Sequence, residues 1–305
     1  MKKIVLFAMV IALIVGAAAC SRPTAEKPSG PDTTLMHLHG LGYSGDGKRL
    51  LVPAHSGIKI YSDGKWSDAP GEKHDYMGFS TVDNGFYSSG HPALDSAYSN
   101  PLGLVKSTDE GKSITILTLE GEADLHGMSA GYRTHTLYVL NEQANSKMKQ
   151  SGLFYSQDEG KAWTGSRMSG VQGQIAALAV HPTQASVVAV GTTAGVFVSN
   201  DYGDSFTVLT AGRSVTSLAF TESGELLAAA SNPKVELLRI NAATKQQTAI
   251  NVPVQGGDTI TYIAGSPVQP KELAIATKNK EIYLSADNGA NWQHIADKGN
   301  IINRP

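Results

Sequence analysis

Short apolar segments alternate with turn residues along the chain from residue 35 onward. The stretch "QIAALAVHP" (174–182) is followed by "SVVAVGTT" (186–193) and "GVFVSNDYGDSF" (195–206), and each has apolar side chains at every second position or in a short run. This period of two predicts β-strands, and no long segment has the 3.6-residue period of an amphipathic helix. The pattern therefore indicates an all-β chain of short strands joined by tight turns.

One turn pattern recurs at a nearly constant distance. "STDEGKSI", "SQDEGKAW", "SNDYGDSF" and "SADNGANW" share the form S-x-D-x-G, and a shortened relative, "SDGKW", precedes them. The five begin at Ser62, Ser107, Ser156, Ser199 and Ser285, so their spacings are 45, 49, 43 and 86 residues. Because 86 is twice 43, a degenerate copy is expected near residue 242, in "RINAATKQQ". The chain is thus predicted to contain six units.

The conserved letters of this pattern suit a hairpin turn. Serine and aspartate side chains bind nearby backbone amides, and glycine takes the left-handed conformation. We therefore expect the aspartates to be structural rather than catalytic: Asp109, Asp158, Asp201 and Asp287.

With these copies, the sequence resembles the Asp-box (BNR) repeat families. They include sialidases, sortilin-type receptors, photosystem assembly factors and glycosyl-hydrolase-like bacterial lipoproteins. The resemblance implies a β-propeller over residues 35–305, and units of this length suit four-stranded blades. We expect six blades, with seven as the alternative.

Histidines and carboxylates fall at matching positions of the first three units. Aligning the inner strands places His39, Met77 and His126 at one equivalent position. Two residues earlier, on the same strand face, stand His37, Asp75 and Asp124. The second strands end at His55, His91 and Glu142. Since neighbouring strands are antiparallel, all nine residues should gather on one rim, opposite the S-x-D-x-G turns. The later units have Ala176, Thr216 and Thr261 where His39 stands.

These residue types predict a transition-metal site. Imidazole binds copper, zinc, iron and nickel, and a thioether favours soft copper. The expected ligands are His37, His39, His55, Met77, His91 and His126, with Asp75, Asp124 and Glu142 as orienting groups or alternative ligands. Copper is favoured ahead of zinc, for storage, delivery or metal-dependent chemistry.

Two other functions fit a propeller of this kind. One is a platform for a protein or peptide partner, with "DSAYSNP" (95–101) and "NEQANSKMKQS" (141–151) as lengthened loops on the histidine rim. The other is a glycoside hydrolase, for which no catalytic residue is assigned. A sialidase-type enzyme is disfavoured because it clamps its substrate carboxylate with clustered arginines, and the mature chain has few.

The N-terminus predicts export and anchoring. "MKKIVLFAMVIALIVGAAAC" has the two lysines, apolar run and small residues of a lipoprotein signal peptide, so residues 1–19 should be removed. Cys20, the single cysteine, is the expected site of diacylation, including palmitate, and residues 20–34 should form a flexible tether. The protein should face the extracytoplasmic side of the cell membrane or outer membrane, where an envelope protein is a possible partner. Without Lys2 and Lys3 the chain has 23 basic and 27 acidic residues, and its charge of −4 gives no reason to expect nucleic-acid binding.

Overall fold

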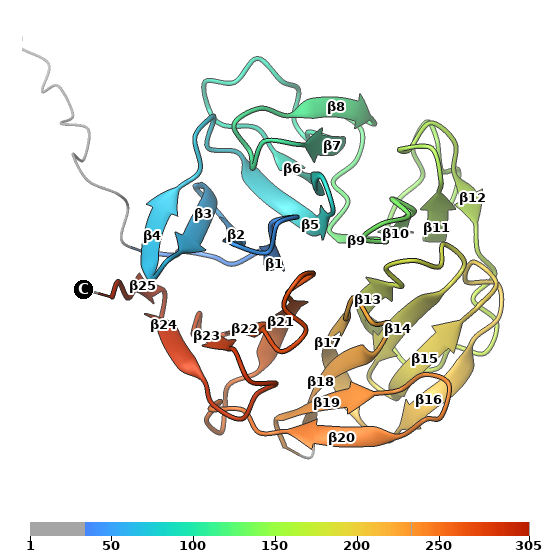
Figure 1. Cartoon of the computed structure of the whole chain (residues 1–305). Coiled ribbons are helices and arrows are strands. Elements are labelled where there is room, and N and C mark those ends of the chain that lie inside the picture. The colour runs from blue at the N-terminus through green and yellow to red at the C-terminus, as the bar shows by residue number, and fades with distance from the viewer. Residues whose placement is uncertain (1–33, 233, 305) are drawn as a thin grey trace, which may run out of the picture. The chain divides into compact units, whose positions relative to one another are not determined.

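The strands of the chain form six antiparallel sheets arranged as the blades of a β-propeller. The computed structural model describes residues 34–232 and 234–304, and the expected signal peptide, Cys20 and tether up to residue 33 lie outside this range. Each sheet begins with an inner strand at the central channel and proceeds outward in chain order. Figure 1 shows the sheets around the ring, with blade one (blue) beside blade six (red). The all-β prediction of six four-stranded blades is confirmed, and the seven-blade alternative is wrong.

The first three blades carry the predicted site. Blade one contains β1 (Gly42–Tyr43), β2 (Leu50–Ala54), β3 (Gly57–Ser62) and β4 (Lys65–Asp68). Blade two contains β5 (Asp75–Val82), β6 (Gly85–His91), β7 (Leu104–Ser107) and β8 (Thr115–Thr118). Blade three contains β9 (Gly127–Ala130), β10 (Leu137–Asn141), β11 (Gly152–Ser156) and β12 (Thr164–Gly165).

The last three blades complete the ring. Blade four contains β13 (Ile175–Val180), β14 (Val188–Thr192), β15 (Gly195–Ser199) and β16 (Thr207–Ala211). Blade five contains β17 (Ser214–Phe220), β18 (Leu226–Asn232), β19 (Glu236–Ile240) and β20 (Gln247–Ile250). Blade six contains β21 (Ile260–Gly265), β22 (Leu273–Thr277), β23 (Ile282–Ser285), β24 (Gln293–Asp297) and a fifth strand, β25 (Asn300–Ile301).

The hydrophobic core is divided among the junctions between blades. Each of six apolar clusters combines side chains of two neighbouring blades. Between blades two and three, for example, Tyr87 and Leu104 pack with Leu137 and Val139, all of them fully buried. A sheet that is apolar on both faces can be covered only by the blades on either side of it. Packing therefore fixes the position of each blade against its neighbours.

The four S-x-D-x-G turns have the same hydrogen bonds. In each, the serine Oγ accepts a bond from the glycine N–H at 2.8–2.9 Å, and the aspartate Oδ1 accepts one from the amide four residues later at 2.8–3.0 Å. The glycines have φ between 80° and 87°, where a side chain would be strained. In blade five, Asn241 occupies the corresponding turn and accepts bonds from the amides of Ala243 and Thr244. This turn lies where the degenerate copy is expected, near residue 242, but its bonds go to the amides two and three residues later rather than four.

The two ends of the described chain close the ring. Thr34 pairs with Asn300, and Leu35 donates a backbone hydrogen bond to Gly299. On the other side, Arg304 donates its amide to Gly64 in the β3–β4 turn. The C-terminal segment therefore contacts both the last and the first blade. Within the part of the chain that the structure describes, there is no helix of the length and apolarity needed to cross a membrane.

Candidate metal centre

The predicted site residues lie on one rim of the ring, at the ends of neighbouring strands. Asp75 begins β5 and is the cross-strand partner of His91, which ends β6. The other end of β6 pairs with Ser107, where a S-x-D-x-G turn begins. The histidine rim and the S-x-D-x-G turns are therefore on opposite sides of the propeller, as the strand pattern predicts.

The inner-strand positions line the central channel, a cavity of about 630 Å³. The residue types that line the channel differ between the two halves of the ring. Blades one to three contribute His39, Met77, His126 and Glu142, whereas the aligned positions of blades four to six contribute Ala176, Thr216 and Thr261. Both threonine hydroxyls donate to backbone carbonyls. Side chains of the types that can ligate a metal therefore gather at one side of the channel mouth.

A first group of ligating atoms lies between blades one and two. It consists of His39, His55 and Asp75, whose potential ligand atoms are all within 4.8 Å of one another. Nδ1 of His55 is hydrogen-bonded to Oδ2 of Asp75 at 2.8 Å. Nε2 of His39 lies 3.3 Å from Oδ1 of the same carboxylate. Asp75 thus reaches back from its own blade to two histidines of the preceding one.

Two buried polar atoms of this first group have no hydrogen-bond partner. They are Nε2 of His39 and Oδ1 of Asp75, which face each other without hydrogen-bond geometry. Burial lowers the pKa of His39; the nearby His37, His55 and His126 lower it further, and Asp75 opposes them. Burial therefore favours the neutral imidazole of His39, the form whose lone pair can bind a metal ion.

A second group lies between blades two and three. It consists of His91, Asp124 and His126, again with ligand atoms within 4.8 Å of one another. Oδ2 of Asp124 lies 2.7 Å from Nε2 of His126 and 3.2 Å from Nε2 of His91. The other carboxylate oxygen, Oδ1, is buried without a partner. On the far side of the His91 ring, Nδ1 donates to the amide oxygen of Asn100 at 2.7 Å, which leaves Nε2 free to bind a metal.

The other three predicted site residues lie outside these groups. The ring of His37 is stacked at 6.1 Å from that of His39 and is 6.0 Å from that of His55. Met77 and Glu142 line the channel mouth, and the Glu142 side chain is exposed. The structure therefore brings six of the nine residues into two three-residue groups and places His37 beside the first.

Both groups have donor types that suit a transition-metal ion, and one pair of donors in each has a suitable spacing. Ligands bonded at about 2.0–2.1 Å in a tetrahedral site are about 3.3–3.4 Å apart. One histidine–carboxylate pair in each group is close to this edge, at 3.3 Å and 3.2 Å and without hydrogen-bond geometry. The other pair is closer, at 2.8 Å in the first group and 2.7 Å in the second, so these two side chains would have to move apart to bind an ion. Neutral imidazoles and carboxylates are also the donors that copper and zinc accept.

Comparison with known proteins gives the fold. No protein-family model matches the sequence, and no curated protein matches it. A gluconolactonase from Xanthomonas campestris has a TM-score of 0.58 and 10% identity, over 83% of this chain and 86% of its own. A GH74 xyloglucanase from the same organism has a TM-score of 0.53 and 16% identity, over 85% of this chain and 45% of its own. YCF48 bound to D1 peptide has a TM-score of 0.50 and 15% identity, over 88% and 85%.

The similarity is one of fold. These proteins share the β-propeller architecture with this chain, and at identities of 10–16% the similarity shows that architecture and nothing further. This chain spans slightly under half of the xyloglucanase, at 45% of its length.

Sequence reasoning missed one polar cluster and one single residue that contacts the site. One is Glu281, His294 and Asp297 on the outer strands of blade six, where His294 lies 2.6 Å from Glu281 and stacks on Tyr283. The other is Asn100, which belongs to the lengthened loop of blade two. The loop was recognisable from its length, but no repeated position of another unit corresponds to Asn100.

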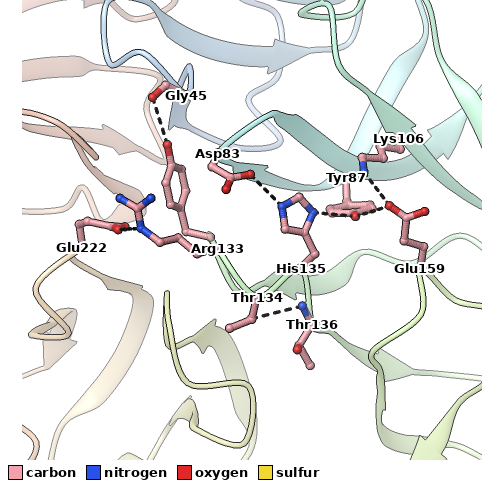
Figure 2. A network of polar contacts seen from close by, with 11 residues as sticks. Gly45, Asp83, Tyr87, Lys106, Arg133, Thr134, His135, Thr136, Glu159 and Glu222 are labelled. Atoms are coloured by element: carbon pink, nitrogen blue, oxygen red, sulfur yellow. Dashed lines mark hydrogen bonds and ion pairs between the residues drawn. The ribbon is translucent and has the colours of Figure 1, made fainter.

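Another polar cluster, on the opposite rim, joins blades two and three. Figure 2 shows His135 between Asp83 and Tyr87, with Nε2 at 2.8 Å from the carboxylate and Nδ1 at 3.0 Å from the tyrosine hydroxyl. The hydroxyl donates to Glu159, which also binds Lys106 at 2.6 Å. Every member has a partner, so this cluster serves as a structural contact between blades.

Proposed function

We propose that the histidine rim binds a transition-metal ion. The observation that carries this proposal is the buried Nε2 of His39 facing Oδ1 of Asp75 at 3.3 Å, with neither atom hydrogen-bonded. Leaving such atoms without partners costs about 1–3 kcal/mol each, and an ion bound between them would remove that cost. The rim would serve metal storage, delivery or metal-dependent chemistry.

Copper is the preferred ion and zinc the second. Met77 lines the channel mouth together with His39 and His126. A thioether beside imidazoles favours copper, because sulfur is a soft ligand that binds Cu(I) better than Zn(II).

Elemental analysis tests the proposal directly. The full-length protein, purified without a histidine tag, is expected to hold near-stoichiometric copper or zinc, and His39→Ala/His126→Ala is expected to lose it. His181→Ala serves as control, because His181 follows β13 on the opposite rim and caps a turn there. Absence of metal from the wild type, even after loading and desalting, would refute the proposal.

We also propose that the chain is a lipoprotein of the Asp-box repeat group. The sequence of residues 1–20 supports removal of a signal peptide and diacylation of Cys20. The shared hydrogen bonds of the four S-x-D-x-G turns support the repeat assignment. Mass spectrometry of the N-terminal peptide tests the anchor. It is expected to find diacylglycerol on Cys20 and to find unprocessed chain for Cys20→Ser.

A second candidate function is a platform for a protein partner in the cell envelope. Residues 92–103 and 142–151 connect second to third strands, so both loops rise on the histidine rim. Leu94, in the first loop, is fully exposed, and the solved structure of YCF48 shows a propeller bound to a peptide. A photo-crosslinking residue at Leu94 is expected to capture an envelope protein that the same residue at Val268, exposed beyond β21, does not capture.

A glycoside hydrolase is the least supported alternative. Five arginines are engaged with different acidic side chains rather than gathered at the channel: Arg49, Arg133, Arg167, Arg213 and Arg239. A clamp for a sialic acid carboxylate is therefore not formed by these residues. Hydrolysis of any member of a panel of chromogenic glycosides by the purified protein would support this alternative.

A further inference from the structure

The two ligand groups are copies of one arrangement at successive blade junctions. In each, the histidine that ends or directly follows a second strand meets the aspartate that precedes or begins the inner strand of the next blade: His55 with Asp75, and His91 with Asp124. A histidine that precedes an inner strand completes each group, His39 before β1 of the preceding blade in the first and His126 before β9 of the following blade in the second. Met77 occupies the equivalent inner position of the middle blade.

Each group has a carboxylate of its own, which separates them as binding sites. Asp75 directs one oxygen to each of its two histidines. Asp124 directs a single oxygen to both of its histidines. No side chain belongs to both groups, so an ion in one does not require a ligand of the other.

The series stops after the second junction. At the junction of blades three and four, Glu142 stands in the place of His55 and His91, and Gln174 in the place of Asp75 and Asp124. Both side chains are exposed, and Ala176 replaces the inner-strand histidine. An alanine and an amide leave too few donors there for a transition-metal ion.

We propose that the rim holds two metal ions in separate sites, one at each of the first two junctions, and that the first site binds more tightly. This inference rests on the proposed metal-binding function and adds its stoichiometry and the order of affinity. The higher affinity of the first site follows from the deeper burial of its side chains and from its larger number of donors. The His39 and Asp75 side chains are 18% and 12% exposed, against 43% and 20% for His91 and Asp124.

His37 adds a donor to the first site. Its ring lies at 6.0–6.1 Å from the rings of both first-site histidines, and its side chain is exposed and free to change rotamer. With His37 the first site has four protein ligands, whereas the second has three and an open position. Closed four-ligand sites retain their ion, and three-ligand sites admit an exchangeable ligand.

Titration of the full-length protein with Co²⁺ tests the stoichiometry, because its visible absorption reports each site as it fills. The wild type is expected to bind two equivalents. Asp75→Asn and Asp124→Asn each remove the carboxylate of one group, and with it the negative charge that offsets the charge of the ion, so each variant is expected to bind one equivalent and the double variant none. Asp95→Asn, an exposed aspartate outside both groups, is the matched control and should retain two. Circular dichroism of the metal-free variants checks that each is folded.

The outcomes separate this inference from the function on which it rests. A wild type that binds no ion overturns the proposed function. A single equivalent in the wild type, or loss of both ions in either single variant, leaves metal binding in place and overturns the two-site inference.

The affinity order has its own test. His37→Ala is expected to weaken Co²⁺ binding about tenfold when combined with Asp124→Asn, which retains the first site. It should leave binding unchanged when combined with Asp75→Asn. Equal weakening in both backgrounds, or tighter binding at the second site, would refute the assigned order.

Discussion

The ring of His91 is held from both sides by side chains of different blades. Asn100 accepts a hydrogen bond from Nδ1 at 2.7 Å, while Nε2 faces Asp124 at 3.2 Å. The amide therefore determines which nitrogen carries the proton and how the ring is oriented. Such orienting bonds contribute to metal affinity although the residue that makes them never touches the ion.

Replacing Asn100 is expected to weaken only the second site. Asn100→Ala removes the acceptor for Nδ1, so His91 loses its fixed tautomer, and affinity there should fall about 10–100-fold. Competition with a chromophoric chelator measures this. Ser99→Ala, in the same loop, is the control, because Ser99 binds Glu120 through its backbone amide. Equal affinity in Asn100→Ala and wild type would mean that the loop plays no part in binding.

The hydroxyl of Tyr87 is a second residue whose role can be measured. Tyr87 is fully buried, and its hydroxyl bonds both Glu159 and His135. Burial, followed by the bond to Glu159, raises the pKa of Tyr87. Tyr87→Phe is expected to lower the free energy of unfolding by about 1–2 kcal/mol, because two polar partners lose a bond. Denaturant unfolding gives the value, and an unchanged midpoint would contradict the assignment.

At the scale of elements, the S-x-D-x-G turn ties stability to pH. In blade four, the side chain of Ser205, its amide and then Ser199 lower the pKa of Asp201 from 3.8 to about 2. A carboxyl whose pKa is lower in the folded state stabilises the fold above its unfolded pKa. That contribution is lost as the pH falls from about 4 towards 2.

Asp201→Asn should therefore show a flatter acid response. The variant is expected to melt at a lower temperature than the wild type above pH 4, and the difference should shrink between pH 4 and pH 2. Thermal melting across this range is the measurement. Asp95→Asn, on an exposed loop, is the control. A difference that stays constant with pH would show that the carboxylate charge does not stabilise the turn.

The elements were largely predictable from sequence, and the contacts between them were not. The turn pattern is local, so its spacing gave the blades, and strand alternation placed the histidines on one rim. An alignment of repeats does not predict whether a side chain contacts the preceding or the following blade. Asp75 shares a strand with Met77 but contacts His39 and His55 of the preceding blade. Asn100 lies in an insertion without a counterpart, so no repeat could reveal it.

At the scale of the whole molecule, the C-terminal segment completes the ring. The amide of Trp66 in blade one donates to Oδ1 of Asn303, and its indole donates to the carbonyl of Ile295 in blade six. Ile302 donates its amide to Ile295, and Arg304 donates its amide to Gly64. The bonds of Trp66 and Arg304 join blades whose residues are more than two hundred positions apart in sequence, and the bond of Ile302 holds the C-terminal segment on blade six.

Deleting residues 300–305 is expected to destabilise the entire ring. The deletion removes four individual hydrogen bonds, the β24–β25 pairing and the Thr34–Asn300 bridge, which at about 1 kcal/mol for each bond corresponds to at least about 4 kcal/mol of unfolding free energy. Denaturant unfolding measures the loss, and Asn303→Ala, which removes one of these bonds, should show at most about a quarter of it. A truncated chain as stable as the wild type would mean that apolar packing between blades one and six closes the ring unaided.

The sharing of each ligand group between two blades has a consequence for a chain with one cysteine. A chain with a single cysteine cannot form an internal disulfide. An ion held by His55 and Asp75, or by His91 and Asp124, would cross-link segments from separate blades and restrict the unfolded chain as a disulfide does. Unlike a disulfide, this metal cross-link would be reversible, because the ion can dissociate and bind again. Metal supply would then set how readily blades one to three open to solvent and to proteases, while blades four to six would respond little.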